Sequence, residues 1–377
     1  MIIDRITADG YKNLEGVDIV PDPKMNIICG ENAQGKTNLV EAVWLCSGCR
    51  SFRGTRDKDF IGFTKEAAKV SMDFTDSVRS QRIEFEVRKG SVKDKTVTLN
   101  GVKLPLLSKL FGSFRCVVFT PEDLNLIKGS PDNRRSFADL SIAQVKPSYV
   151  SALNKYNMIL AQRNAALKSI GRDGSGAELL DVWNDQLVKA GTYISVLRYA
   201  FCITLNNYTK PLYSSITDGK ENLDLYYHST VYDTLDGRLN DTESREMEYA
   251  EKLKASAEND FRAGFTTVGI HRDDIGAYID GLSVRDFGSQ GQARSAALAM
   301  KLAHARILKA EQGEYPVMLL DDVLSELDEK RRRFILNNIE DMQVIITCCD
   351  EKSVTDMTSG KIFRMKNGRA ETKEQGR

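Results

Sequence analysis

One short segment restricts the fold of this chain more than any other feature of its sequence. Residues 30–37 read GENAQGKT and match the phosphate-binding loop pattern G-x-x-x-x-G-K-[ST]. The apolar run Met25–Cys29 predicts a buried strand before the loop, and the residues from Lys36 onward predict a helix after it. Because a strand, a loop and a helix in this order form a phosphate site, the segment predicts an α/β fold that binds a nucleoside triphosphate.

The residue types in this loop have separate expected roles. Glycines allow consecutive backbone N–H groups to point at phosphate oxygens, and the N-terminus of the following helix adds a partial positive charge. Lys36 is expected to reach the β- and γ-phosphates, and Thr37 to offer its hydroxyl to Mg²⁺. The predicted nucleotide contacts of the loop are Gly30, Glu31, Asn32, Ala33, Gln34, Gly35, Lys36, Thr37 and Asn38.

A second acidic segment supplies the carboxylates that such a site needs. Residues 317–328 read VMLLDDVLSELD, and the apolar run 317–320 predicts a buried strand. Asp321 ends this strand, where a phosphate-loop fold places the carboxylate that orders Mg²⁺. Asp322 follows as a second carboxylate, placed to hold the attacking water. The alternative is a strand followed by a plain acidic turn, and the phosphate loop upstream favours the catalytic interpretation.

A third segment, FGSQGQAR at residues 287–294, leads into an apolar helical run. Ser289-Gln-Gly-Gln292 resembles the serine-glycine-glutamine signature of ABC-type ATPases, which covers the γ-phosphate held by the other monomer. A Ser hydroxyl and Gly amides at a helix N-terminus form an anion site. The alternative is that Ser289 only caps the helix. The order of phosphate loop, helical insertion, signature and acidic strand favours a signature.

Hydrophobic patterning divides the chain into three regions, which are strand-rich, helical, and alternating between helix and strand. Strands are predicted at 2–8, 17–20, 25–29, 69–74, 82–88, 96–99 and 116–120, with a hairpin turn at Asn100-Gly101 before Val102–Leu104. After about residue 126, helical spacing predicts long helices through 149–167 and 180–205, a Gly-rich turn at 171–176, and a third helix over about 242–262. Strands are expected again at 266–270 and 277–279, followed by alternating helix and strand.

Two domain arrangements explain this order of strand-rich, helical and mixed regions. A helical unit inserted between two halves of one nucleotide-binding domain produces it, and so do two consecutive domains. With 377 residues, two units are a fair expectation. The motifs favour the insertion, so we expect an α/β P-loop NTPase of the ABC/SMC-like type. Its discontinuous head is predicted at 1–125 and 265–377, and a mainly helical arm domain at 126–264.

Several segments together resemble the RecF family of bacterial recombination-mediator ATPases, in the SMC-like branch. They cover essentially the whole length and read ITADGYKNLEGVDI, GENAQGKTNL, SFRGTRDKDFI, FTPEDLNLIKGSPDNRRSF, TTVGIHRDDI, GSQGQARS and LLDDVLSELD. The resemblance implies ATP and Mg²⁺ as cofactors, and an ATPase head whose arm is short compared with SMC coiled coils. It implies an ATP-dependent homodimer that closes head to head on DNA and reopens through slow, DNA-stimulated hydrolysis.

The resemblance also implies partners and residue roles. The family acts on gapped and double-stranded DNA without sequence specificity, with RecR and RecO, and helps RecA replace single-strand-binding protein. Carried onto this sequence, Asp322 is the water-positioning base, and Ser289 and Gln292 engage the partner's nucleotide. Asp328, in the turn at 325–328, is expected to communicate across the dimer interface.

Two departures from the ABC pattern have consequences. ABC transporters usually carry Glu where Asp322 stands, and a shorter acid predicts slow turnover. The strand predicted at 343–347 continues as TCCD without a switch histidine, so Thr347 is expected near the γ-phosphate. The glutamine of the usual Q-loop is also missing, which leaves Glu122 and Asp123 as candidates on the metal side.

The balance of basic and acidic residues restricts how the chain can bind nucleic acid. Because 53 basic residues balance 53 acidic ones, DNA contact must come from local basic clusters. Each such residue is alternatively a solvated or paired surface charge. No base-reading motif is present, so we expect binding through the DNA backbone, with strong salt dependence. The candidate DNA contacts are Arg50, Arg53 and Arg56, with Lys58 beside them, and Lys128, Arg134 and Arg135.

Other features favour a cytoplasmic protein with no membrane contact. The chain lacks an apolar run of about 18 residues, and its start, MIIDRITADG, lacks the apolar region of a secretory signal. Its seven cysteines include a lone Cys46-Ser-Gly-Cys49 and are expected to be buried hydrophobes rather than a metal or redox site. His228 and His304 are expected to be structural. The cluster His271-Arg-Asp-Asp274 fits a structural hydrogen bond or a role at the nucleotide interface or in arm positioning.

Two other functions use the same phosphate loop. A transporter ATPase subunit is disfavoured by the missing switch histidine and the long helical insertion. A small-molecule kinase is disfavoured because it has no need of a serine-glycine-glutamine site.

Overall fold

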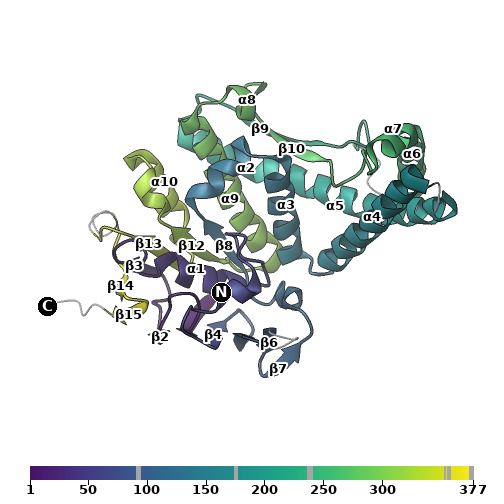
Figure 1. Ribbon diagram of the computed structural model, residues 1–377. Helices are drawn as coiled ribbons and strands as arrows, with labels where there is room; N and C mark the ends of the chain where they lie inside the picture. The colour runs from purple at the N-terminus through teal and green to yellow at the C-terminus, as the bar shows by residue number, and fades with distance from the viewer. Residues whose placement is uncertain (91–94, 174–176, 236–240, 352–353, 355–357, 373–377) are drawn as a thin grey trace. The chain divides into compact units, whose positions relative to one another are not determined.

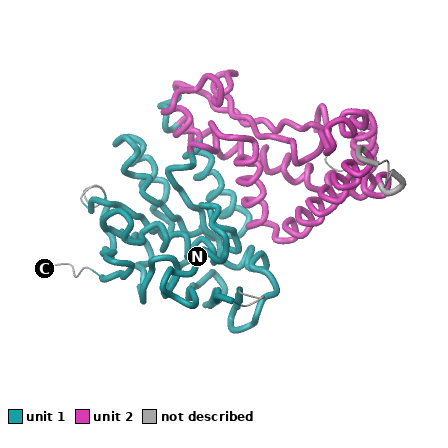
Figure 2. The backbone as a smooth tube through the Cα atoms, viewed as in Figure 1, with its two compact units in different colours: residues 1–123, 215–219, 297–377 teal, residues 124–214, 220–296 magenta. Residues whose placement is uncertain are grey.

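The computed structural model describes residues 1–90, 95–173, 177–235, 241–351, 354 and 358–372 (Figure 1). The chain divides into two compact units (Figure 2). Unit 1 comprises residues 1–123, 215–219 and 297–377, and unit 2 comprises residues 124–214 and 220–296. None of the helices in the described ranges is both long and apolar enough to cross a membrane.

A mostly parallel sheet forms the centre of unit 1. Its order is β15-β14-β3-β13-β12-β8, and only the hairpin partner β15 runs antiparallel to its neighbour. β12 and β13 are buried at every position, as apolar strands covered on both faces should be. The carboxyl ends of the parallel strands share one edge, where such folds bind ligands. The strands are β3 (Met25–Cys29), β8 (Cys116–Phe119), β12 (Val317–Asp321), β13 (Val344–Cys348), β14 (Lys361–Lys366) and β15 (Arg369–Thr372).

A second, antiparallel sheet in unit 1 has the order β2-β1-β4-β5-β6-β7. β5 alternates between exposed and buried side chains, the pattern of a strand with one solvated face. Asn100 and Gly101 both have positive φ, 54° and 78°, as a two-residue hairpin turn requires. The predicted strands of the N-terminal third are confirmed: β1 (Ile2–Asp9), β2 (Val17–Ile19), β4 (Ala67–Thr75), β5 (Ser80–Arg88), β6 (Lys95–Leu99) and β7 (Val102–Leu104).

Helices complete unit 1. α1 (Lys36–Leu45) follows β3, and α10 (Glu329–Asn338) follows β12. α9 (Gln290–Gln312) belongs to unit 1 from residue 297 onward. Short 3₁₀ turns lie at η1 (Asp57–Phe60), η2 (Leu107–Leu110), η3 (Pro121–Leu124) and η4 (Val323–Glu326).

Unit 2 is mainly helical and contains one small antiparallel sheet, β11-β10-β9. The two long predicted helices are confirmed as α4 (Ser148–Asp173) and α5 (Ala177–Thr217). The turn predicted at 171–176 is wrong for residues 171–173, which belong to α4, and its residues 174–176 lie outside the described residues. The third predicted helix is broken at Ser256 into α6 (Thr242–Ala255) and α7 (Ala257–Ala263). The remaining elements are α2 (Asn125–Lys128), α3 (Pro131–Val145), α8 (Val284–Phe287), β9 (Leu223–His228), β10 (Asp274–Ile279) and β11 (Leu282–Ser283).

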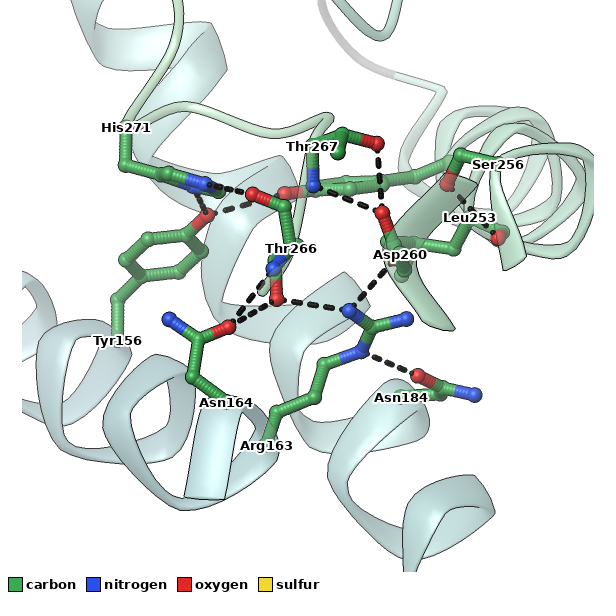
Figure 3. A network of polar contacts seen from close by, with 11 residues as sticks. Tyr156, Arg163, Asn164, Asn184, Leu253, Ser256, Asp260, Thr266, Thr267 and His271 are labelled. Carbon is green, nitrogen blue, oxygen red and sulfur yellow. Dashed lines mark hydrogen bonds and ion pairs between the residues drawn. The ribbon is translucent and has the colours of Figure 1, made fainter. Parts of the chain in front are cut away.

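The strand predicted at 266–270 is wrong, because this segment is an irregular loop. Side chains, rather than a neighbouring strand, satisfy its backbone: the Thr266 N–H donates to Asn164 Oδ1 at 2.8 Å, and the Thr267 N–H donates to Asp260 Oδ1 at 2.8 Å (Figure 3). A segment whose amides are already bonded to side chains has no donors left for a ladder.

The compact units and the predicted domains are not identical. Unit 2 begins at residue 124, two positions before the predicted arm domain. Residues 265–296 belong to unit 2, although the sequence analysis placed them in the head, and residues 215–219 belong to unit 1. The assignment of 1–125 and 265–377 to one ATPase head therefore stays a prediction.

Candidate nucleotide site

The phosphate loop joins the buried strand β3 to helix α1, as its sequence predicts. Gly35 precedes the helix with φ 108°, and Ala33 also has a positive φ of 63°. A Cβ atom at Gly30 would lie 2.5 Å from the carbonyl oxygen of Met365, so no larger residue fits there. These constraints hold the loop in a tight turn over the N-terminus of α1, where backbone N–H groups are available to an anion.

The ammonium group of Lys36 is the positively charged group of this loop that could bind phosphate. Its side chain is only 4% exposed, and its ammonium donates to the carbonyl oxygens of Gly30 at 2.7 Å and Glu31 at 3.1 Å. It also lies 3.3 Å from Cys349 Sγ. No carboxylate of the described chain forms an ion pair with Lys36. A nearly buried cation that contacts only neutral acceptors fits an anionic ligand.

Asp321 lies at the carboxyl end of β12 and collects two threonine hydroxyls. Thr37 Oγ1 donates to Asp321 Oδ1 at 3.1 Å, and Thr347 Oγ1 donates to the same oxygen at 2.8 Å. Burial raises the pKa of Asp321, the two hydroxyls lower it, and the carboxylates of Asp322 and Glu122 raise it further. Gathered carboxylates with an adjacent hydroxyl are a set of oxygen donors that suits a divalent cation such as Mg²⁺.

The metal-binding set is small. Among the residues that the structure describes, no three His, Cys, Asp or Glu side chains gather closely enough to hold a metal by themselves. Mg²⁺ usually binds proteins through one or two carboxylates together with substrate phosphates. Of the two metal-side candidates after β8, Asp123 pairs with Lys301 at 2.8 Å and accepts the Thr120 N–H. Only Glu122 therefore stays available.

Asp322 has an unusual backbone. Its φ of 53° is in the left-handed region, which Asp tolerates better than most residues. The Asp322 N–H donates to Thr347 Oγ1 at 2.9 Å, and the Ser325 hydroxyl donates to the Asp322 carbonyl at 2.6 Å. The carboxylate itself makes no hydrogen bond to any described residue, so it is available to a water molecule.

Thr347, near the end of β13, is 1% exposed and bonds to Asp321, so its place near the γ-phosphate stays a prediction. Cys349, just after β13, is exposed, and its thiol lies 3.0 Å from Asn32 Oδ1 in the phosphate loop. Sequence reasoning missed Cys349, although its place just after a strand of the same edge was a usable signal.

A cavity of about 340 Å³ adjoins the phosphate loop. Ala33 and Gln34 of the loop line it, and Phe63 at its rim is fully exposed. Sequence analysis assigned no role to this place, although the segment GYKNLEG, residues 10–16, contributes to it. The other lining residues are Lys12, Asn13, Leu14, Glu15, Gly62, Thr64, Lys65 and Asn367.

The signature residues lie in unit 2 and form a reciprocal helix cap. The Ser289 N–H donates to Gln292 Oε1 at 2.8 Å, and the Gln292 N–H donates to Ser289 Oγ at 3.1 Å. Gln292 Nε2 also donates to Glu221 at 2.9 Å. This arrangement is a capping box, which agrees with the alternative that Ser289 caps the helix. Ser289 is nevertheless exposed, and its O–H hydrogen has no acceptor in the described part of the chain.

Asp328 likewise caps a helix. Its carboxylate accepts the Arg331 N–H at 3.0 Å at the start of α10 and forms an ion pair with the Arg331 side chain. This bonding lowers the pKa of Asp328, with the backbone hydrogen bond as the main cause.

The structure corrects one of the six predicted DNA contacts, Arg134, and gives two others hydrogen-bond partners within unit 2. Arg134 is 3% exposed and forms a bidentate pair with Asp274 at 2.6 and 2.8 Å. Arg135 donates to the Asp273 carbonyl at 2.6 Å, and Lys128 donates to the Gly288 carbonyl at 2.6 Å. These cations are occupied by partners within unit 2. The exposed candidates are Arg50, Arg53 and Arg56, with Lys58 beside them.

The His271–Asp274 cluster has a structural role within unit 2. His271 Nδ1 lies 2.8 Å from the Tyr156 hydroxyl and its Nε2 lies 3.0 Å from the Thr266 carbonyl (Figure 3). Burial lowers the pKa of His271 to about 4, so the ring is neutral near pH 7. Asp273 accepts the Tyr227 hydroxyl at 2.5 Å. Together with the Arg134–Asp274 pair, these bonds all lie within unit 2 and favour the interpretation as structural hydrogen bonds.

His304 and six of the cysteines are buried, and His228 contacts a tyrosine hydroxyl. His304 is buried, which lowers its pKa to about 3, and His228 Nε2 lies 2.9 Å from the Tyr278 hydroxyl. Six of the seven cysteines are buried free thiols, and burial raises the pKa of both Cys46 and Cys49 to about 12. The predicted burial of Cys46 and Cys49 is therefore confirmed.

Known proteins resemble this chain over nearly its full length. The family model of the RecF/RecN/SMC N terminal domain matches residues 2–374. DNA replication and repair protein RecF of Lachnoclostridium phytofermentans is 38% identical over 348 residues, 92% of each chain. RecF of Clostridium perfringens is 37% identical over 376 residues, 98% of this chain and 99% of that protein.

Solved structures agree with these sequence matches. The structure described as the recombination mediator protein RecF-ATPrS in the RecFOR pathway has a TM-score of 0.91 at 32% identity, and covers 98% of this chain and 97% of that one. An Smc head bound to the C-winged helix domain of ScpA has a TM-score of 0.56 at 16% identity, which shows a shared fold. The chain therefore belongs to the RecF family, and its fold is the α/β P-loop fold of the ABC- and SMC-like ATPases.

Proposed function

We propose that this chain is an ATP-dependent DNA-binding protein of replication and recombinational repair, which closes as a dimer on DNA and reopens through slow ATP hydrolysis. The observation that carries the proposal is the meeting of Lys36, Thr37, Asp321 and Asp322 at one edge of the parallel sheet. Relatives named DNA replication and repair protein RecF support the biological role. A solved relative described as RecF-ATP supports the choice of nucleotide.

The phosphate loop, residues 30–38, is the proposed seat of the triphosphate. Lys36 would exchange its bonds to the loop carbonyls for phosphate oxygens, which are stronger acceptors because they are charged. The adjoining cavity gives the nucleoside a place beside Ala33 and Gln34, and the exposed ring of Phe63 offers a face for stacking. Bound ATP with Mg²⁺ supplies a γ-phosphoryl group whose charge the ion neutralises.

Thr37 and Asp321 are the proposed protein ligands of Mg²⁺, with Glu122 as a further carboxylate nearby. Asp322 is the proposed water-positioning residue, because its carboxylate is available and stands next to the metal ligand in the chain. Aspartate is one methylene shorter than the glutamate of fast ABC ATPases. A carboxylate that reaches water less well predicts slow hydrolysis.

The proposed dimer would complete each nucleotide site with a signature from the other copy. Ser289 is the stronger candidate of the two signature residues, because its O–H hydrogen is available and it stands at the N-terminus of α9. Gln292 uses both side-chain polar atoms within unit 2, so a direct contact would require it to release Glu221 or Ser289. Asp328 is proposed to signal across the interface from the start of α10.

DNA binding is proposed to use the exposed cluster Arg50, Arg53 and Arg56, on the segment that follows α1. Arginine suits phosphate oxygens, and the absence of base-reading elements favours binding to gapped and double-stranded DNA without sequence preference. RecO and RecR are the proposed partners, with RecA loading as the outcome and the cytoplasm as the site of action. The described RecFOR context of the solved relatives supports this choice of partners.

The decisive experiment measures ATP hydrolysis and DNA retention by the purified chain. DNA should stimulate hydrolysis, and ATP with Mg²⁺ should retain the chain on gapped duplex DNA at low salt. The retention should fall steeply as salt increases, because binding rests on phosphate contacts. A chain that hydrolyses ATP without stimulation by DNA, and that shows no ATP-dependent retention, would favour a transporter-type ATPase subunit.

A further inference from the structure

Thr347 connects the two acidic residues of the proposed site through a single hydroxyl. The strand register places it directly opposite Asp321, because β13 pairs with β12 in parallel. Its oxygen donates its hydrogen to Asp321 Oδ1 at 2.8 Å and accepts the Asp322 N–H at 2.9 Å. One side chain therefore contacts the proposed metal ligand and the backbone of the proposed water-positioning residue.

A hydroxyl can make both contacts at once from a single atom. Thr347 is 1% exposed, so water cannot easily replace either bond. A serine or threonine offers one donor and an acceptor on the same atom, whereas valine of similar shape offers neither. The Asp322 N–H would then lose its acceptor in a partly buried place, and Asp321 would keep only Thr37 as a hydroxyl donor.

The second contact fixes a conformation that most residues avoid. Asp322 has φ 53°, and its N–H bond to Thr347 holds it there from the side of β13. The Ser325 hydroxyl holds the carbonyl of the same residue. The direction of the Asp322 carboxylate follows from this backbone, so Thr347 sets the direction without touching the carboxylate.

We propose that Thr347 is a positioning residue that orients the Mg²⁺-binding Asp321 and the water-positioning Asp322 together. The inference rests on the proposed ATPase function and deepens it. Thr347 makes no contact with the nucleotide in this proposal and acts only through its two acidic neighbours. Through these two bonds Thr347 links the position of Asp321, the proposed metal ligand, to the backbone geometry of Asp322, the proposed water-positioning residue. The sequence alone does not reveal this link.

The test compares Thr347→Val with Thr347→Ser in the full chain. Thr347→Val should bind a fluorescent ATP analogue normally without Mg²⁺, because Lys36 and the phosphate loop are unchanged. Its Mg²⁺ affinity in the presence of the nucleotide should fall about tenfold, as is typical when a partner of a metal ligand is lost. Its kcat should fall about 100-fold with little change in KM, the size of effect expected for a misplaced water-positioning group.

Thr347→Ser keeps the hydroxyl and should stay within about threefold of the wild type in all three measurements. Thr98→Val is the matched control, because it removes a hydroxyl that donates to Glu84 in the other sheet of unit 1. This control should leave Mg²⁺ affinity and kcat unchanged. A folded Thr347→Val with wild-type Mg²⁺ affinity and kcat would overturn the proposal, and so would a Thr347→Ser as impaired as Thr347→Val.

If Thr347→Val does not fold, Thr347→Cys carries the test, because a thiol is a similar-sized but weak donor and acceptor. A folded Thr347→Cys should lose kcat and Mg²⁺ affinity in parallel, and unchanged values would overturn the proposal. Wild-type measurements separate this outcome from a failure of the proposed function. A wild-type chain that neither binds nor hydrolyses ATP contradicts the function itself, whereas an active wild type with an equally active Thr347→Val contradicts only the role of Thr347.

Discussion

The ammonium nitrogen of Lys36 lies 2.7 Å from the carbonyl oxygen of Gly30, at the other end of the same phosphate loop. The loop thus holds its cation in place through neutral acceptors. Phosphate oxygens entering the loop would gain a charged donor that is already positioned. Little conformational freedom would then be lost on binding, which favours affinity.

Replacing Lys36 with methionine tests the role of that charge. Lys36→Met keeps most of the side-chain volume but removes the ammonium, so we expect ATP affinity to fall at least about 30-fold, or roughly 2 kcal/mol. Equilibrium titration with a fluorescent ATP analogue measures the loss. Lys24→Met removes an exposed lysine just before β3 and should bind normally. A Lys36→Met variant with wild-type affinity would show that the loop does not bind the triphosphate.

Ser289 provides a test of the composite site. Ser289→Arg places a bulky cation at the exposed N-terminus of α9, so we expect it to block the approach of a second copy while leaving the ATP affinity of each monomer unchanged. Light scattering with ATP and Mg²⁺ should show a dimer for the wild type and a monomer for the variant. Ser151→Arg changes an exposed serine of α4 and should dimerise normally. Normal ATP-induced dimerisation of Ser289→Arg would contradict a role for this serine in trans.

The exposed arginines after α1 give a quantitative prediction for DNA. Each phosphate contact contributes about −0.9 to the slope of log affinity against log salt, so the triple glutamine variant of Arg50, Arg53 and Arg56 should flatten that slope by up to about three. A matched control converts three other exposed arginines of unit 1, Arg79, Arg82 and Arg88. Equal losses in the two variants would mean that overall charge, rather than this cluster, binds DNA.

The fold of the nucleotide site was predictable because its signals are local. The glycines of residues 30–37 and the apolar strand before them encode a tight turn into a helix within one short segment. The acidic pair Asp321 and Asp322 follows an equally clear buried strand. In a parallel sheet such strand ends meet at one edge, so local patterns were enough to bring distant residues together.

The predictions that failed have the opposite cause, because they concern residues whose bonding partners lie far away in the sequence. Arg134 looks like a surface cation beside Arg135, and nothing near it reveals that Asp274, 140 positions later, binds its guanidinium. The segment 266–270 has the apolar and β-branched composition of a strand. Its amides are nevertheless taken by Asn164 and Asp260, and no local pattern contains that information.

Asp260 provides the last prediction, which concerns stability rather than activity. Its carboxylate is fully buried, bonds to Arg163 at 2.7 Å, and accepts the N–H and hydroxyl of Thr267 at 2.8 and 2.6 Å (Figure 3). Asp260→Asn keeps the shape but leaves the Arg163 charge buried without its counter-charge. We expect a loss of about 3–5 kcal/mol in the free energy of unfolding.

Urea unfolding followed by circular dichroism measures this loss, since unit 2 is mainly helical. The matched control is Glu258→Gln on the same helix, α7, because Glu258 pairs with Arg262 at 2.7 Å in a solvent-exposed i,i+4 arrangement. Exposed pairs of this kind contribute about 0.3–0.5 kcal/mol, so the control should unfold almost as the wild type does. If Asp260→Asn and Glu258→Gln were equally stable, the buried ion pair would not stabilise unit 2. The hydrogen bonds between residue 260 and Thr267 would then be enough to maintain its stability.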